Sequence, residues 1–301
     1  MIPGSFDYFA PRSLEEAFEL LAEHGADAKL LAGGHSLLPL MKLRLAAPRV
    51  VVDLGRIGDL SYMRDDGEEI ALGAMVTHAE VEHSELLRRR AALLAETAAE
   101  IGDVQVRNRG TLGGALAHAD PAADYPAAVL ALEAEFTLAS RSGTRAVKAK
   151  DFFVDLLTTA LEPGEILTEV RFKADGERTG SAYCKLHQPA SGFAIVGVAA
   201  RVRLDAKGKC EAAAVGVTGV AAKAYRATQV ERALKGKALN DKVIAQAASS
   251  AAAGAEPLAD LHASARYRKA MAEVFARKAL TEALARALAR RSLGAGGRAK
   301  K

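Results

Sequence analysis

The sequence predicts an α+β fold built from more than one domain, and three observations carry that prediction. Helix and strand signals alternate in short segments over the first 175 residues. Strand signals then dominate as far as residue 218, and helical signals follow from residue 228. Between these regions, residues 175–180 form a charged, glycine-bearing connector of the kind that marks a domain boundary.

The N-terminal segment, residues 1–55, alternates between strand and helix as a βαβ unit does. A capping-box pattern at residues 13–16 begins a helix, and Gly25 ends it. Residues 28–32 then form a short apolar strand, and a further strand surrounds residues 50–54.

The second segment, residues 56–176, mixes strands with helices. A glycine-rich stretch at residues 110–126 interrupts this pattern without the polarity expected of a solvent-exposed loop. The predicted strands are 69–73, 135–139, 146–148 and 166–172, and the predicted helices are 77–83 and 86–101.

The third segment, residues 177–290, places its strands before its helices. We therefore expect a three-stranded antiparallel sheet followed by a helical bundle, and a flexible basic tail over residues 291–301. The predicted strands are 182–187, 194–204 and 210–218, and the predicted helices are 228–234, 242–253 and 264–288.

The composition excludes several classes of protein. Two cysteines, Cys184 and Cys210, are too few for a disulfide framework, a cysteine-ligated zinc site or an iron–sulfur cluster. The formal net charge of +4 is too small an excess to argue for nucleic-acid binding. Neither a secretion signal nor an apolar run of about 18 residues occurs, so we expect a cytoplasmic protein without an integral membrane segment, at most peripheral at the inner membrane face.

The first candidate site is a glycine turn that follows the strand at residues 28–32. In the run Ala32-Gly33-Gly34-His35-Ser36, two glycines allow successive backbone N–H groups to converge on one anion. Ser36 adds a hydroxyl, and a helical turn from about Leu37 adds its positive end. A pyrophosphate suits such a turn, although a tight turn with a buried histidine is an equally open interpretation.

The second candidate site repeats this logic. Thr111-Leu112-Gly113-Gly114-Ala115 offers a hydroxyl, two glycines and small residues against which a ligand can lie. Asp120 and Asp124 follow, and their carboxylates suit the hydroxyls of a ribityl or ribose chain. Two such loops favour a dinucleotide. Because no G-x-G-x-x-G follows a strand and no Walker A lysine exists, the fold is expected to be neither Rossmann nor P-loop.

These two loops carry a family resemblance. Residues 32–48 (AGGHSLLPLMKLRLAAP) and 111–127 (TLGGALAHADPAADYPA) resemble the two FAD signatures of the medium subunits of molybdenum-containing hydroxylases, the xanthine dehydrogenase family. Residues 6–21, 191–202 and 260–280 resemble further parts of the same family. The resemblance implies a two-part FAD-binding domain of the vanillyl-alcohol oxidase type, followed by an α+β C-terminal domain.

The resemblance also implies roles for individual residues. The two glycine loops would wrap the FAD pyrophosphate, Asp124 would bind the ribityl or ribose chain, and the flavin ring would lie near Lys185, Ile166 and Phe193. No side chain is expected to be catalytic, because the flavin carries the chemistry. The implied cofactor-binding residues are Ala32, Gly33, Gly34, His35, Ser36, Ile101, Thr111, Leu112, Gly113, Gly114, Ala115, His118, Asp120, Asp124, Ile166, Lys185 and Phe193.

Some residues depart from the family pattern. Relatives commonly have asparagine at the position of Ala115, so one FAD contact worth about 1 kcal/mol is lost. Relatives often have an asparagine–glycine pair where His118 and Ala119 stand, and some have tyrosine at the position of Phe193. FAD is expected to be held without a covalent bond, so His35 would donate to phosphate or pack beneath the loop.

The implied function is electron transfer with partner subunits. FAD on this chain would take electrons from [2Fe-2S] clusters on a small subunit. These clusters would receive the electrons from a molybdenum cofactor on a large subunit. The electron acceptor would be a quinone, a cytochrome or oxygen, and the complex would be a dimer of heterotrimers. As an alternative, the chain could be the medium subunit of an N-heterocycle or aldehyde hydroxylase. A stand-alone FAD oxidoreductase and a non-catalytic scaffold that has lost FAD also remain open.

Overall fold

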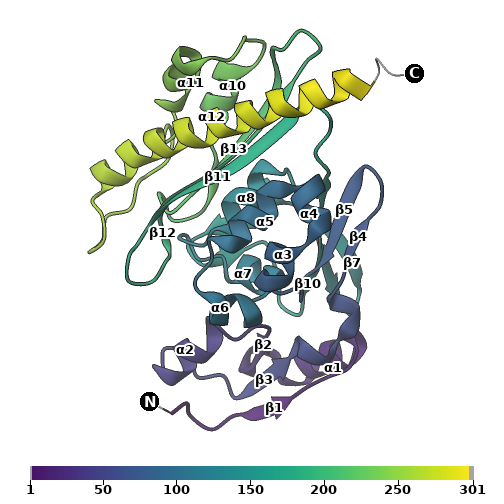
Figure 1. The fold of residues 1–301 in the computed structure, drawn as a ribbon. Helices are drawn as coiled ribbons and strands as arrows, with labels where there is room; N and C mark the ends of the chain where they lie inside the picture. The colour runs from purple at the N-terminus through teal and green to yellow at the C-terminus, as the bar shows by residue number, and fades with distance from the viewer. Residues whose placement is uncertain (1, 298–301) are drawn as a thin grey trace.

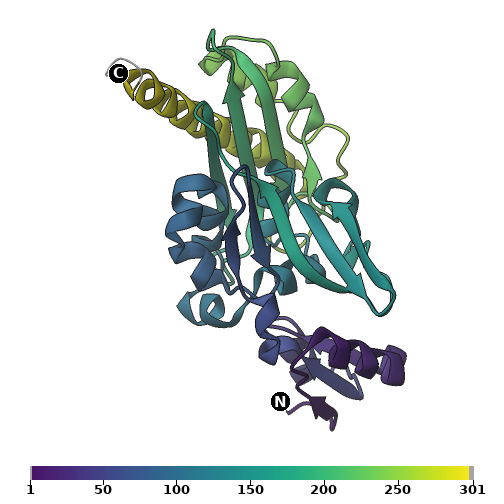
Figure 2. The ribbon, with the colours of Figure 1, turned by 90° about the vertical axis from the view of Figure 1, so that its right-hand side faces the viewer.

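The computed structural model describes residues 2–297, with side chains as far as residue 290, and arranges them in three stacked units. The N-terminal unit lies at one end, a middle unit follows, and the C-terminal unit lies at the other end (Figure 1). The same order is seen after a quarter turn, with the N-terminal unit joined to the middle one over a limited area (Figure 2).

The N-terminal unit is a three-stranded parallel sheet with the order β1-β3-β2. Its central strand is completely apolar over Val50, Val51 and Val52, and all three are buried. The predicted helix start is confirmed, because the Ser13 hydroxyl accepts a hydrogen bond from the Glu16 amide. The elements are β1 (Asp7–Phe9), α1 (Leu14–His24), η1 (Gly25–Asp27), β2 (Ala28–Leu31), α2 (Leu37–Lys42) and β3 (Val50–Asp53).

The middle unit is a five-stranded antiparallel sheet, β4-β5-β10-β6-β7, with helices packed on it. Two short 3-10 turns, η2 (Leu54–Arg56) and η3 (Gly58–Leu60), lead into it. The elements are β4 (Met63–Asp65), β5 (Glu69–Gly73), α3 (His78–His83), α4 (Glu85–Arg90), α5 (Ala92–Ala99), α6 (Val104–Arg109), α7 (Leu112–His118), α8 (Tyr125–Ala131), β6 (Glu135–Ser140), β7 (Gly143–Lys148), α9 (Ala149–Phe152), β8 (Phe153–Asp155), β9 (Thr158–Thr159) and β10 (Ile166–Lys173).

Two predictions for this middle unit are wrong. The single helix expected over residues 86–101 is two helices, because the chain turns at Ala91 and the Arg90 carbonyl accepts a hydrogen bond from the Asp175 amide. The glycine-rich stretch at residues 110–126 is not an interruption, since it contains α7 and the start of α8. Thr111 caps α7 by accepting a hydrogen bond from the Gly114 amide.

The C-terminal unit has one strand more than the sequence predicted. Its antiparallel sheet has the order β11-β12-β13-β14, and the two-residue β14 is too short to leave a period-2 pattern. Three helices follow the sheet. The elements are β11 (Thr179–His187), β12 (Ala194–Leu204), β13 (Cys210–Thr218), β14 (Tyr225–Arg226), α10 (Thr228–Leu234), α11 (Asp241–Ala248) and α12 (Ala265–Gly297).

This C-terminal sheet is covered on both faces. Ala182 and Val198 belong to the core shared with the C-terminal helices, whereas Ala199, next to Val198 along β12, belongs to the core of the middle unit. Close approach of helix backbones requires glycine on each face. A Cβ on Gly180 would overlap α12, and one on Gly216 would overlap α8.

The long final helix corrects the expected tail. Helix α12 continues to Gly297, so residues 291–297 belong to the helix and not to a flexible tail, and residues 298–301 lie outside the described residues. A helix that is already formed gains one hydrogen bond for each residue added, which offsets the cost of about 1 kcal/mol for each glycine. Among the described residues, no helix is both long and apolar enough to cross a membrane.

Candidate functional site

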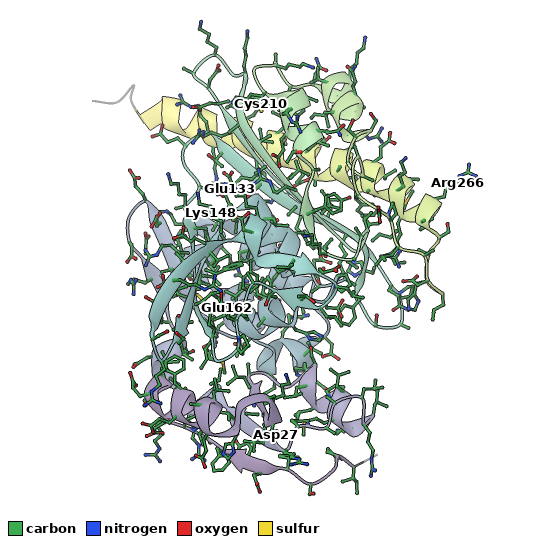
Figure 3. The ribbon with its side chains drawn as sticks, turned by 180° about the vertical axis from the view of Figure 1, so that it is seen from behind. Asp27, Glu133, Lys148, Glu162, Cys210 and Arg266 are labelled. Carbon is green, nitrogen blue, oxygen red and sulfur yellow. The ribbon has the colours of Figure 1, made fainter. Side chains whose placement is uncertain are left out.

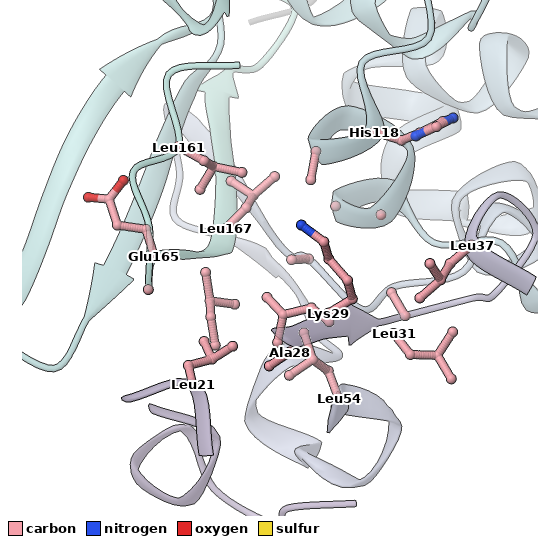
Figure 4. A pocket seen from close by; sticks show the side chains of 18 of the residues that line it. Leu21, Ala28, Lys29, Leu31, Leu37, Leu54, His118, Leu161, Glu165 and Leu167 are labelled. Atoms are coloured by element: carbon pink, nitrogen blue, oxygen red, sulfur yellow. The ribbon is translucent and has the colours of Figure 1, made fainter. Parts of the chain in front are cut away.

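The main cavity of the described structure lies between the N-terminal and middle units and has a volume of about 1370 Å³. Figure 4 shows Lys29 on β2 extending into this space, with Leu161 and Leu167 across from it. His118 on α7 also belongs to the lining. Glu162 also lines it, on the side of the middle unit toward the N-terminal unit that carries Asp27 (Figure 3). Cys210 lies in the C-terminal unit, away from the cavity.

The two glycine loops meet at one wall of this cavity. A Cβ on Gly33 would overlap the carbonyl oxygen of Arg109 and come within 2.6 Å of the Gly110 Cα. A Cβ on Gly114 would lie 3.2 Å from the Ala32 Cβ. The sequence predicted two loops that share one ligand, and the structure brings them into contact across 77 positions of sequence.

The first loop presents free hydrogen-bond donors. Within residues 2–297, no intramolecular hydrogen bond is made by the backbone amides of residues 33–36. Gly34 adopts a φ of +78°, which L side chains rarely adopt, and a positive φ of this kind is typical of the backbone turns that bind anions through N–H groups. The carbonyl of Gly34 instead starts α2 by accepting from the Leu38 amide.

The second loop uses its amides inside the protein. Leu112 and Gly113 donate to the carbonyls of Val76 and Ala74 at 2.9 and 2.8 Å. The Gly114 and Ala115 amides donate to the Thr111 hydroxyl and carbonyl at 3.1 and 3.0 Å. This loop therefore offers a flat surface without Cβ atoms, and it contributes few free donors.

His78 is a site residue that the sequence analysis missed. Its side chain is only 4% exposed and lines the cavity beside Gly110. Its ring packs edge-on against Tyr125, and its Nδ1 has no hydrogen-bond partner. Burial first, then the nearby charges of His35 and Arg107, lower the pKa of His78 to about 4, so the ring is neutral at pH 7. The capping box of Thr77 and Glu80 places His78 at the first position of α3. This capping pattern is visible in the sequence and could have located His78 at the start of a helix.

The cavity gathers most of the residues that the resemblance implied. His35 is exposed to it, and Ile166 lies at its far wall. The predicted residues that line the cavity are Ala32, Gly33, Gly34, His35, Ser36, Thr111, Gly113, Gly114, Ala115, His118 and Ile166. The predicted residues that do not line it are Ile101, Leu112, Asp120, Asp124, Lys185 and Phe193.

Asp124 and Lys185 form a buried ion pair between the middle and C-terminal units. Lys185 Nζ lies 2.9 Å from Asp124 Oδ2, and the Tyr183 hydroxyl donates to Asp124 Oδ1 at 2.5 Å. The Asp124 side chain is 5% exposed and that of Lys185 is 1% exposed. Burial raises the pKa of Asp124 to about 6, although Lys185 and Tyr183 act in the opposite direction.

The remaining predicted residues surround a smaller cavity or the core. Phe193 is 47% exposed and lines a space of about 190 Å³ together with Asp120. Ile101 is half-buried, and Gly192 approaches Gly102 beside it. Leu112 is fully buried in the core, where its side chain fixes the start of α7.

The cavity fits a dinucleotide with two phosphates. Its volume exceeds the range of about 300–1,000 Å³ that is usual for ligand pockets, as an extended ligand requires. The free amides of residues 33–36 are the chemistry that binds a pyrophosphate without a charged side chain. Among the described residues, no group of three or more His, Cys, Asp or Glu side chains is placed to hold a metal ion.

Family models match both parts of the chain. The model of the FAD binding domain in molybdopterin dehydrogenase matches residues 4–172, and that of the CO dehydrogenase flavoprotein C-terminal domain matches residues 181–283. The chain therefore belongs to the FAD-binding medium subunits of the molybdenum hydroxylases, which confirms the resemblance carried by the two loops.

Individual relatives are similar over nearly their whole length. The chain is 42% identical to the carbon monoxide dehydrogenase medium chain of Hydrogenophaga pseudoflava, over 95% of this chain and 99% of that one. It is 38% identical to the 6-hydroxypseudooxynicotine dehydrogenase complex subunit alpha of Paenarthrobacter nicotinovorans, over 95% and 97%. A solved structure of carbon monoxide dehydrogenase from Hydrogenophaga pseudoflava matches with a TM-score of 0.92 and 43% identity, over 95% of this chain and 99% of that chain.

Proposed function

We propose that this chain is the electron-transfer subunit of a molybdenum hydroxylase complex and holds its FAD in the large cavity. The observation that carries this proposal is the set of free amides at residues 33–36, which lie on the cavity wall. These donors suit the pyrophosphate of FAD. The second loop supports the same group by offering the bare backbone of Gly113 and Gly114.

The protein's own contribution is binding, orientation and exclusion of water. FAD, when bound, supplies a carrier that accepts and releases electrons one or two at a time. Neutral His78 closes the wall beneath the loops without adding a charge. Leu161 and Leu167 give the opposite wall an apolar surface that suits a planar ring.

The electrons are proposed to come from outside this chain. A small subunit with [2Fe-2S] clusters delivers them, and a large subunit with the molybdenum cofactor oxidises the substrate. An external acceptor, a quinone, a cytochrome or oxygen, then takes them from this chain. Free Cys184 and Cys210 lie on different strands, β11 and β13, and are too few to hold a cluster, which supports this division. The complex is proposed to be a cytoplasmic dimer of heterotrimers, peripheral at most to the inner membrane face.

Carbon monoxide is the first candidate substrate of the complex. The relative with 42% identity belongs to carbon monoxide dehydrogenase, but the relative with 38% identity belongs to a 6-hydroxypseudooxynicotine dehydrogenase complex. The likeness of a flavin subunit does not separate these substrates, because substrate binding is proposed to lie on the large subunit.

Co-purification from the native host tests the proposal. A tagged chain is expected to bring down two further polypeptides, with molybdenum, iron and FAD in fixed ratio to the chain. Activity of the isolated complex with carbon monoxide, an aldehyde and an N-heterocycle then identifies the substrate. A lone, FAD-containing chain that oxidises an organic donor would support the stand-alone oxidoreductase instead, and a colourless chain in excess FAD would contradict both.

A further inference from the structure

His78 lies where the two glycine loops meet. Its backbone amide donates to the Gly110 carbonyl at 2.9 Å, and the preceding Thr77 forms an isolated antiparallel bridge with Thr111. A Cβ on Gly110 would lie 2.5 Å from His78 Nε2, and a Cβ on Gly33 would lie 2.6 Å from the Gly110 Cα. The imidazole, Gly110 and Gly33 therefore pack against one another in that order, and the ring reaches the wall that carries the free amides.

The two ring nitrogens of His78 have different surroundings. Nδ1 is enclosed by protein and has no hydrogen-bond partner among the described residues. Nε2 also makes no hydrogen bond within the described part of the chain, but it is not enclosed, and the ring lines the cavity. Nε2 is therefore the polar atom that this side chain presents to a ligand.

The proton of the neutral ring belongs on Nε2. At pH 7 the imidazole carries a single proton, because burial lowers the pKa of His78 to about 4. An enclosed N–H without an acceptor is rarer in proteins than an enclosed acceptor without a donor, which disfavours the proton on Nδ1. The N–H group at Nε2 is thus an uncharged donor at the surface of the cavity.

We propose that His78 Nε2 donates a hydrogen bond to a pyrophosphate oxygen of the ligand in the large cavity, as a third part of the binding site beside the two glycine loops. The identity of this ligand rests on the proposed FAD function, whereas the placement of the ring does not. The amides of residues 33–36 bind an anion through the backbone, and a neutral donor adds to them without the cost of burying a cation.

The ring of His78 is held in place before a ligand binds. Tyr125 packs edge-on against it, with the ring centroids 5.1 Å apart, and Gly110 lies against its Nε2 edge. His35, the histidine of the first loop, is exposed by comparison. A donor that is already fixed loses less side-chain entropy on binding than an exposed one. The geometry therefore favours His78 over His35 as the histidine that orients the pyrophosphate.

Nitrogen-15 NMR of the histidine side chains and FAD titration of the full chain test this proposal. His78→Phe keeps the ring packing and removes the N–H group, whereas His78→Gln can place an amide N–H near the position of Nε2. His83→Phe is the matched control, because His83 lies on the same helix and its side chain is exposed. The His78 signals are assigned by their loss in the variants, and FAD affinity is measured by flavin fluorescence.

FAD is expected to shift the Nε2 resonance of His78 and to slow the exchange of its proton with water. Inorganic pyrophosphate, a probe without the flavin, should have the same effect. His78→Phe should raise the FAD dissociation constant about tenfold, because a hydrogen bond to a charged acceptor is stronger than one between neutral groups. His78→Gln should stay within about threefold of the wild type, and His83→Phe within about twofold. If His78→Phe does not fold, the wild-type spectra, assigned with His78→Gln, decide.

An Nε2 resonance of His78 that is unchanged at saturating FAD would overturn the proposal. Equal weakening of FAD binding in His78→Phe and His78→Gln would overturn it as well, since the ring would then act by packing alone. Unchanged affinity in His78→Phe would do the same. If the wild-type chain binds no FAD, the proposed function fails, whereas the response of Nε2 to inorganic pyrophosphate still decides whether His78 binds phosphate.

Discussion

Both glycine loops contain a Gly-Gly pair, but their backbone amides differ in whether the protein accepts their hydrogen bonds. The first leaves the amides of residues 33–36 without partners within the described chain, while the second donates four successive amides to Val76, Ala74 and Thr111. One Gly-Gly pair therefore serves as a donor site and the other as a packing surface. The motif alone predicts close backbone approach, and the neighbouring segments of the chain decide whether a ligand or the protein receives the hydrogen bonds.

Alanine at Gly33 or Gly113 is the strongest way to break this comparison. A Cβ on Gly33 would overlap the backbone of Arg109, and one on Gly113 would overlap Ala74, so we expect each to lower the free energy of unfolding by about 2–3 kcal/mol. FAD affinity should fall more than a hundredfold in Gly33→Ala and less than fivefold in Gly113→Ala. Chemical denaturation and FAD titration measure both effects.

Gly58→Ala is the control for this pair, because nothing lies within 4 Å of the added Cβ and no positive φ is required there. Its stability should change by less than about 0.5 kcal/mol. Equal losses of FAD affinity in Gly33→Ala and Gly113→Ala would show that both loops supply donors.

Acid sensitivity should arise where the two loops meet, at His78. Its folded pKa of about 4 lies below the value of 6.5 for an exposed histidine, so the unfolded chain binds a proton that the folded chain does not. The free energy of unfolding should therefore fall as the pH drops from 6.5 to 4, by roughly 3 kcal/mol from this group. His78→Phe keeps the packing on Tyr125 and should flatten this part of a denaturation series, and an unchanged slope would contradict the assignment.

Thr111→Val tests the second loop alone. It removes the hydroxyl that accepts from the Gly114 amide, and the loss of such a cap costs about 1 kcal/mol of stability. If this loop is a surface and not a donor site, FAD affinity should change less than threefold. Thermal unfolding and FAD titration are the measurements, and a tenfold gain in affinity would mean that the freed amide binds the cofactor.

Ala119→Gly should give the smallest effect, and it stabilises the protein. Ala119 ends α7 with a φ of +51°, a conformation that glycine adopts without strain. We expect the free energy of unfolding to rise by about 0.5–1 kcal/mol. A loss of stability in thermal unfolding would mean that the buried methyl group of Ala119 contributes more than the backbone strain costs.

Much of the fold was readable from local patterns, because capping and periodicity are local. Helix α1 begins at its predicted cap, and α10 matches its predicted residues 228–234. The break between α4 and α5 was not readable, since no glycine or proline marks it and the Arg90 carbonyl is taken by Asp175 from 85 positions away. The family relationship was readable from the two loops and was confirmed.

The sequence predicted which residues line much of the candidate site, but it predicted less of how they are arranged. The sequence located both loops that line the cavity, but the partners of the second loop come from residues 74–76, which no spacing rule connects to it. The burial of His78 was hidden because a histidine at the first turn of a helix usually faces water. The pairing of Asp124 with Lys185 joins two domains and could not follow from either segment alone.

The C-terminal sheet contributes side chains to two hydrophobic cores, and this should make the thermal unfolding of the chain cooperative. Alternate side chains of its strands pack into the two cores on opposite faces. Glycine at residues 180 and 216 allows α12 and α8 to approach these faces closely. Stripping either helix layer would expose an apolar face, so neither matched domain keeps its fold when the other is lost. The two family models match residues 4–172 and 181–283, on either side of the connector, but calorimetry should show a single heat-absorption peak for the whole chain.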